Sequence, residues 1–224
     1  MNLPPPVAII WDWDNTLVDG WAAIAAGLAA AFSEHGLQPW TEAEVKARVR
    51  RSLRETFPEI FGARWEAARD TFYREVRACH LQVLNPMPGA EAALRAAAAL
   101  VPLAVNSNKQ GPLLRAEAEA LGWAPLFTRL VGAGDAAADK PDPAPMALGL
   151  AACGVPAGPA VWYVGDTALD MVAARRAGCT AVLLGDAAHD GGVVNANPDA
   201  AFVSGHALAE YLQCLAKPVA TGQI

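Results

Sequence analysis

Residues 7–16 read VAIIWDWDNT. The first five of these residues are apolar, and the apolar run ends at Asp12. The run enters from three prolines and is bounded by Asp12, so it predicts a short, buried parallel strand. In an open parallel sheet the functional site lies at the carboxyl ends of the strands. We therefore expect the polar residues that follow Trp11 to belong to a site.

Similar apolar runs recur downstream, and alanine-rich helical stretches separate them. The runs cover residues 103–105, 129–131, 161–164 and 181–184, and the helical stretches cover residues 90–100, 113–121, 144–153 and 169–177. Gly122, Gly154 and Gly178 fall just past the ends of predicted helices, where a left-handed residue commonly closes the last turn. Strands that alternate with helices predict an α/β fold with a doubly wound parallel sheet of the Rossmann-like kind.

The alternation fails between residues 20 and 86, where helical segments follow one another with no apolar strand between them. We expect helices over residues 21–35, 42–55 and 63–84, each with an interrupted apolar stripe. The pattern predicts a small helical insert at residues 20–86, after the first strand, and an α/β core formed by residues 1–19 and 87–224.

The composition is that of a globular protein, with 54% hydrophobic and 18% charged residues among 224. A formal charge of −6 argues against a broad basic surface for nucleic acid. The N-terminus lacks the pattern of a signal peptide, and no apolar run reaches membrane-spanning length. We expect a cytoplasmic protein with no nucleic-acid or membrane partner, and the sequence leaves its oligomeric state open.

The cysteines and histidines do not predict a disulfide framework or a zinc site. Their spacing is irregular, without a Cys-x-x-Cys pair or a histidine pair at ligand spacing, and we expect reduced thiols and ordinary packing or surface histidines. The residues concerned are Cys79, Cys153, Cys179, Cys214, His35, His80, His189 and His206.

Polar clusters follow four of the predicted strands. They are Asp12-Trp13-Asp14-Asn15-Thr16, Asn106-Ser107-Asn108-Lys109, Lys140 in the loop after the third strand, and Gly165-Asp166-Thr167 with Asp170 beyond. One crevice is expected to receive four carboxylates, a hydroxyl and a lysine. Carboxylates gathered at one sheet edge repel one another unless a cation neutralises them. Hard oxygen ligands at a phosphate-handling site favour magnesium.

Taken in order, these clusters resemble the four motifs of the haloacid dehalogenase superfamily. Asp12-Trp13-Asp14-Asn15-Thr16 is similar to its first motif, Asp-x-Asp-x-Thr, and Ser107, Lys140 and residues 165–170 resemble the second, third and fourth. The helical insert resembles the family's small C1 cap. In length, cap placement and motif style the chain resembles the phosphoglycolate phosphatase branch.

The resemblance implies a role for each catalytic residue. Asp12 would attack phosphorus and form an aspartyl-phosphate, while Asp14 would protonate the leaving oxygen and then deprotonate the hydrolytic water. Ser107 and local amides would hold a phosphoryl oxygen, and Lys140 would balance charge on Asp12 and the phosphoryl group. Asp14 also separates phosphatases from dehalogenases, which lack the second aspartate.

The resemblance implies a Mg²⁺ site as well. Asp12, the backbone carbonyl of Asp14, and Asp166 would bind the ion. Asp170 would contribute through water or orient Asp166, and the sequence leaves both open. The residues assigned to binding of the phosphorylated substrate near this site are Thr16 and Asn108.

Two departures from the family pattern concern the substrate. Asn106 stands where the family often has an apolar or small residue, and residues 48–54 lack the glycine common in its substrate loop. In the predicted helix 42–55, basic residues recur every four positions along one side. They indicate either a solvated helix face or contacts to a second anionic group of the substrate, and on the second interpretation the substrate-binding residues are Arg50, Arg51 and Arg54.

Three functions are compatible with these motifs. The favoured one is hydrolysis of a small phosphomonoester, such as one like phosphoglycolate. A phosphomutase would pass the phosphoryl group from the aspartate to another hydroxyl and not to water. A non-catalytic binding or regulatory protein could keep the fold, although the carboxylates at all the acidic motif positions are intact.

Overall fold

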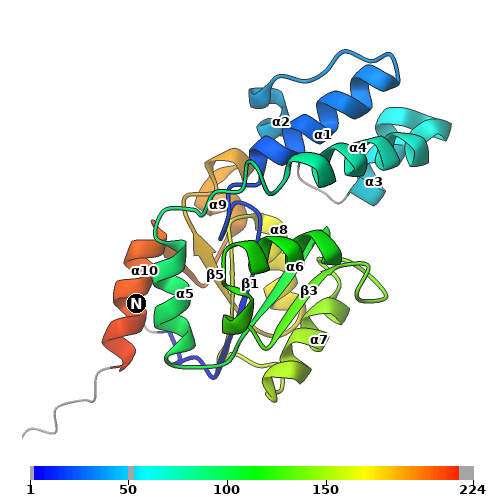
Figure 1. Cartoon of the computed structure of the whole chain (residues 1–224). Coiled ribbons are helices and arrows are strands. Elements are labelled where there is room, and N and C mark those ends of the chain that lie inside the picture. The colour runs from blue at the N-terminus through cyan, green and yellow to red at the C-terminus, as the bar shows by residue number, and fades with distance from the viewer. Residues whose placement is uncertain (1–2, 50–52, 217–224) are drawn as a thin grey trace, which may run out of the picture.

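The computed structural model of the chain describes residues 3–49 and 53–216. Its centre is a six-stranded parallel sheet in the order β3-β2-β1-β4-β5-β6 (Figure 1). The strands are β1 (Ala8–Trp11), β2 (Leu103–Gln110), β3 (Arg129–Ala133), β4 (Val161–Gly165), β5 (Thr180–Leu184) and β6 (Ala200–Phe202). The predicted α/β class and parallel sheet are confirmed.

Helices cover both faces of the sheet, and β1 is buried between them. The helices α5 (Ala90–Ala98), α6 (Gly111–Ala120) and α10 (Gly205–Ala216) pack on one face, and α7 (Pro143–Cys153), α8 (Ala168–Arg176) and α9 (Gly192–Ala196) on the other. Ile9 and Trp11 join the first layer and Ile10 the second, because successive strand residues point to opposite faces. Within the described residues, no helix is both long and apolar enough to span a membrane.

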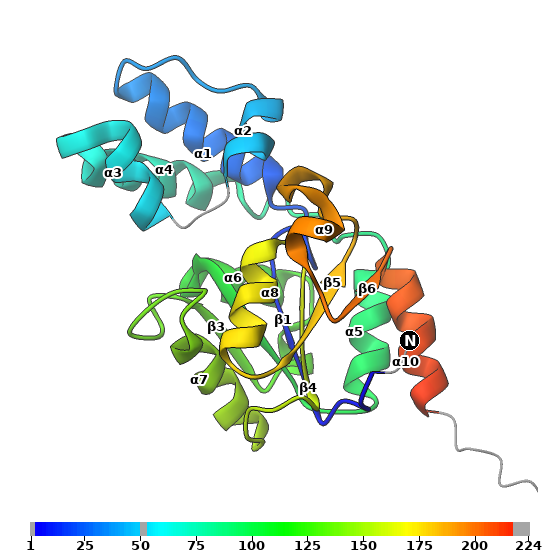
Figure 2. The ribbon, with the colours of Figure 1, turned by 180° about the vertical axis from the view of Figure 1, so that it is seen from behind.

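Four further helices gather beyond the carboxyl ends of the strands (Figures 1 and 2). They are α1 (Trp21–Glu34), α2 (Glu42–Arg48), α3 (Leu53–Phe61) and α4 (Trp65–Cys79). Their apolar side chains form a separate buried cluster, in which the rings of Phe57 and Phe72 lie 5.7 Å apart. Leu113 of α6 joins this cluster and connects it to the sheet layer. The domain boundaries at residues 20 and 86 stay a prediction.

The structure corrects several predicted elements. The helix expected over residues 42–55 ends at Arg48, because Val49 takes extended backbone angles (φ −79°, ψ 94°), and a separate helix follows from Leu53. The helix expected over residues 63–84 ends at Cys79. The elements β6, α9 and α10 were not predicted. The glycine positions are confirmed, since Gly122, Gly154 and Gly178 have φ values of 68°, 70° and 71°.

Candidate active site

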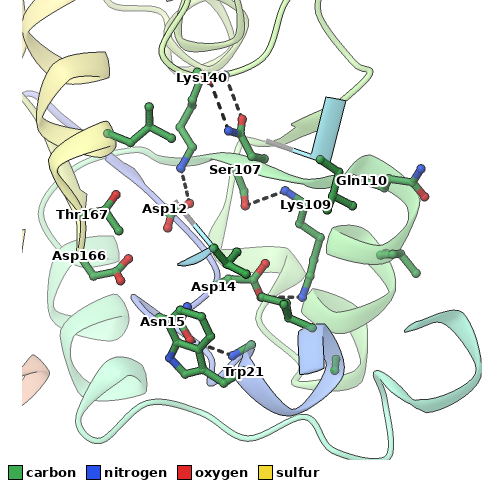
Figure 3. A pocket seen from close by; sticks show the side chains of 18 of the residues that line it. Asp12, Asp14, Asn15, Trp21, Ser107, Lys109, Gln110, Lys140, Asp166 and Thr167 are labelled. Carbon is green, nitrogen blue, oxygen red and sulfur yellow. Dashed lines mark hydrogen bonds and ion pairs between the residues drawn. The ribbon is translucent and has the colours of Figure 1, made fainter. Parts of the chain in front are cut away.

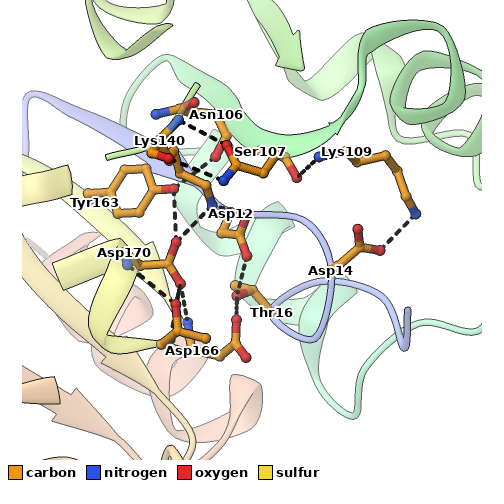
Figure 4. Close-up of polar contacts among 12 residues, drawn as sticks. Asp12, Asp14, Thr16, Asn106, Ser107, Lys109, Lys140, Tyr163, Asp166 and Asp170 are labelled. Carbon is orange, nitrogen blue, oxygen red and sulfur yellow. Dashed lines mark hydrogen bonds and ion pairs between the residues drawn. The ribbon is translucent and has the colours of Figure 1, made fainter. Parts of the chain in front are cut away.

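Three buried carboxylates meet where β1 and β4 end. Asp12 follows β1, Asp166 follows β4, and Asp170 lies in the first turn of α8; one oxygen from each lies within 4.8 Å of the others. Lys140, from the loop before α7, reaches into the group. Its Nζ lies 2.6 Å from Asp12 Oδ1 and 2.8 Å from Asp170 Oδ1 (Figure 4). The expected crevice of carboxylates and a lysine is therefore present.

Burial controls the electrostatics of these four groups. It raises the pKa of Asp12 to about 7, against the opposing charge of Lys140. Burial, with the neighbouring Asp170 and Asp12, raises the pKa of Asp166 well above its usual value. Burial alone would lower the pKa of Lys140, but the carboxylates outweigh it and raise that pKa. If all three carboxylates are ionised, one lysine leaves two negative charges uncompensated.

The carboxylates differ in how many of their oxygens the protein already uses. Asp170 accepts hydrogen bonds at both oxygens, at Oδ1 from Lys140 Nζ and at Oδ2 from Asp166 N, Thr167 N and Thr167 Oγ1. These four donors match the roughly four lone-pair positions of a carboxylate. Asp166 Oδ2 is buried with no hydrogen-bond partner in the described residues, although His189 Nε2 lies 3.4 Å away. Asp166, unlike Asp170, has an oxygen that accepts no hydrogen bond and can bind a cation.

The charge and donor set fit a magnesium ion. The two negative charges left over when all three carboxylates are ionised, a buried carboxylate oxygen that accepts no hydrogen bond, and oxygen-only ligands are what a hard divalent cation prefers. Asp12 and Asp166 are the side chains best placed to hold it. The hydrogen bonds of Asp170 favour the interpretation in which it orients its neighbours.

Thr16 and Asn108 have partners other than those expected for substrate-binding residues. Thr16 is 1% exposed, and its Oγ1 donates to Asp166 Oδ1 at 2.8 Å. The amide of Asn108 donates to the carbonyl oxygen of Lys140 at 3.3 Å and accepts from its backbone nitrogen at 2.9 Å. The structure therefore gives both residues positioning contacts, since Thr16 fixes Asp166 and Asn108 fixes the loop that carries Lys140.

A cavity of about 180 Å³ opens over Asp12 and continues between the sheet and the helices α1 and α4 (Figure 3). Its polar lining includes Ser107, Lys140 and Asp166. Its apolar lining includes Trp21, Ile24, Phe72, Tyr73, Val76 and Leu113. Arg50 and Arg51, predicted to bind substrate, lie outside the described residues, as does the side chain of Arg54.

Three residues near the site received no role from the sequence. Lys109 stands in the quoted cluster after β2, and its Nζ lies 2.7 Å from Asp14 Oδ1. Glu117 is buried in an alanine-rich helix and gives no local signal, yet it contacts the same lysine. His189 lines the cavity beside Trp21, with ring centroids 5.5 Å apart. Only Lys109 could have been singled out, because it follows a strand as the other site residues do.

Comparison with known proteins identifies related sequences. The family model of haloacid dehalogenase-like hydrolases matches residues 9–184. A phosphoglycolate phosphatase from Rhodospirillum rubrum is 34% identical over 192 residues, which cover 80% of this chain and 79% of that protein. A phosphoglycolate phosphatase from Chromobacterium violaceum is 36% identical over 202 residues, covering 83% and 87%.

Solved structures share the fold at lower sequence identity. A haloacid dehalogenase-like hydrolase from Streptococcus pneumoniae has a TM-score of 0.82 at 21% identity, covering 93% of this chain and 99% of that one. A predicted phosphoglycolate phosphatase from Haemophilus somnus has a TM-score of 0.77 at 22% identity, covering 93% and 98%. These likenesses agree with the observed sheet and its helical layers.

The buried position of Lys140 predicts a large effect on stability. Lys140→Met leaves Asp12 and Asp170 without their cation, so we expect the free energy of unfolding to fall by about 3–5 kcal/mol. Urea denaturation in the presence of a chelator measures the change. Lys46→Met is the matched control, because Lys46 forms an exposed pair with Glu42 and should cost less than about 1 kcal/mol. Equal losses in the two variants would show that the Lys140 contacts do not stabilise the fold.

Proposed function

The chain belongs to the haloacid dehalogenase-like hydrolases, and from this premise we propose that it is a magnesium-dependent phosphatase of small phosphomonoesters that acts through an aspartyl-phosphate. The observation that carries the proposal is the position of Asp12, which is 6% exposed, lines the cavity and is held by Lys140. The naming of relatives at 34% and 36% identity as phosphatases favours hydrolysis over transfer to a second hydroxyl.

Asp12 and Lys140 support the first half of the reaction. A carboxylate oxygen of Asp12 forms a bond to phosphorus as the bond from phosphorus to the leaving oxygen breaks. Lys140 fixes Asp12 Oδ1, which leaves Oδ2 as the attacking oxygen, and it also offsets charge on the phosphoryl group. Ser107 lines the cavity too, and its hydroxyl can donate to a phosphoryl oxygen.

Asp14 supplies the proton chemistry in both halves. It lines the cavity two residues after the nucleophile, and burial raises its pKa above the usual value, which favours a protonated carboxyl able to donate. In the first half its proton goes to the leaving oxygen. In the second half its carboxylate takes a proton from the water that attacks phosphorus, and Asp12 is released.

Asp12, Asp166 and the backbone carbonyl of Asp14 are the groups that would hold the magnesium ion. When bound, the ion would offset the negative charge shared by the carboxylates and the phosphoryl group, and so favour the ionised form of Asp12. Thr16 and Asp170 hold Asp166 in place through hydrogen bonds. The first donates to Asp166 Oδ1, and the second accepts from the backbone nitrogen of Asp166.

Phosphate release from p-nitrophenyl phosphate tests the activity and the nucleophile together. Wild-type protein should hydrolyse the ester with Mg²⁺ and stop when a chelator is added in excess. Asp12→Asn should lower kcat by about 10⁴-fold or more, since a covalent nucleophile has been removed. Asp70→Asn alters an exposed aspartate that pairs with Arg69 and should leave the rate unchanged. Turnover by Asp12→Asn within tenfold of wild type, or full activity in chelator, contradicts the proposal.

Phosphoglycolate is the substrate that we propose, on the names of the relatives and on the basic residues after Val49. Val49 and Leu53 both line the cavity, on either side of Arg50 and Arg51 in the sequence. We expect Arg50→Ala, Arg51→Ala and Arg54→Ala to lower kcat/KM for phosphoglycolate and to spare p-nitrophenyl phosphate, because only the former has a second anionic group. Equal effects on both substrates, or none on either, would assign these arginines to a solvated surface.

A further inference from the structure

A second buried charge cluster lies beside the first and is centred on Lys109. Its Nζ lies 2.7 Å from Asp14 Oδ1 (Figure 4). The same nitrogen lies 2.8 and 2.6 Å from the two carboxylate oxygens of Glu117. The side chains of Lys109 and Glu117 are 8% and 1% exposed. An ammonium group has three hydrogens to donate, and these three contacts use all of them. The lysine is therefore fixed in one direction, toward Asp14.

Glu117 is itself held by two further donors. Trp13 Nε1 donates to Glu117 Oε2 at 2.7 Å, and His80 Nδ1 lies 2.8 Å from Glu117 Oε1. Trp13 stands between Asp12 and Asp14, and His80 is the residue after α4, so Glu117 connects the end of β1 to the end of that helix. Any movement of the Glu117 carboxylate would leave buried donors unpaired, which is costly in a low-dielectric interior.

Gly20 closes the other side of Asp14. The turn after Asp14 folds back on the start of α1, because Asn15 takes a φ of 63° and its Oδ1 accepts from the Gly20 nitrogen at 3.2 Å. A Cβ added to Gly20 would lie 2.5 Å from Asp14 Oδ1, closer than any real contact. Gly20 has a φ of −85°, which other residues adopt, so the position requires glycine for space and not for backbone conformation.

We propose that Lys109, oriented by Glu117, is a positioning residue that holds the carboxyl of Asp14 in the direction needed for proton transfer. The inference rests on the proposed function, in which Asp14 is the acid and the base. Lys109 engages Oδ1, and the other oxygen of Asp14 is the one left to face the leaving oxygen and later the water. The contact thus selects which carboxyl oxygen carries the proton.

Esters with different leaving groups separate this role from a merely structural one. A p-nitrophenolate leaves without a proton, whereas the alkoxide of benzyl phosphate needs one, and the two substrates are similar in size. Because kcat/KM reports formation of the phosphoenzyme, it depends on the acid function only for benzyl phosphate. We expect Lys109→Met to lower kcat/KM for benzyl phosphate by about 10²–10⁴-fold, the usual contribution of general acid catalysis, and for p-nitrophenyl phosphate at least tenfold less.

Glu117→Gln gives the same test without removing the buried lysine, because it keeps the shape of the side chain that orients Lys109. Gly20→Ala displaces Asp14 while leaving the pair of Lys109 and Glu117 in place, so it shows what misplacing Asp14 alone does. Both should show the same difference between substrates, as should Asp14→Asn. The double variant Asp14→Asn/Lys109→Met should lose no more than Asp14→Asn alone. Gly158→Ala is the matched control, because nothing lies within 4 Å of its added Cβ.

The outcomes distinguish the inference from the proposed function. If wild-type protein cleaves neither ester, the proposed function fails and the inference fails with it. If wild-type protein cleaves both, but Lys109→Met and Glu117→Gln lower kcat/KM by the same factor for each ester or leave it unchanged, the inference alone is overturned. Should Lys109→Met lose its cooperative thermal transition, the result for Glu117→Gln decides.

Discussion

The arrangement of the site depends on holding three buried carboxylates around a single lysine. Lys140 contacts Asp12 and Asp170, and the other carboxylate oxygen of Asp170 fixes the backbone before α8. Burial of like charges at this density is unfavourable unless hydrogen bonds and a cation offset it. Gly165 is part of the same constraint, because an added Cβ would lie 2.4 Å from Asp170 Cβ. The end of β4 must be glycine for the carboxylate to approach.

Asp12 and Asp14 are each held by a different lysine. Lys140 contacts Asp12, and it is oriented by Asp170 at its side chain and by the amide of Asn108 at its backbone. Lys109 contacts Asp14 and Glu117, and Glu117 in turn contacts His80 after α4. Residues two apart in the chain are thus fixed by separate networks. The second network reaches the end of α4, a helix that also lines the cavity.

The parts of this site that were predictable are those that depend on local sequence. Asp12, Lys140 and Asp166 follow apolar strands, and parallel strands bring their carboxyl ends to one edge, so the crevice follows from the pattern.

The break between α2 and α3 at Val49 was not predictable from apolar periodicity, which continues across it. The contact between Lys109 and Glu117 joins residues eight apart, from β2 into α6, and nothing in an alanine-rich helix indicates that its glutamate points inward. Thr16 and Asn108 were recognised as site residues, but their partners depend on side-chain directions that only the structure gives.

The central claim is that the phosphoryl group is transferred to Asp12 before it reaches water. Rapid acid quench of protein turning over a phosphomonoester with Mg²⁺, followed by proteolysis and mass spectrometry, locates the covalent phosphate. We predict a phosphorylated peptide whose modification maps to Asp12, with none formed when a chelator is present. A covalent phosphate on another residue, or turnover with no phosphoenzyme detected at any quench time while a known aspartyl-phosphate enzyme yields one under the same conditions, would contradict the account.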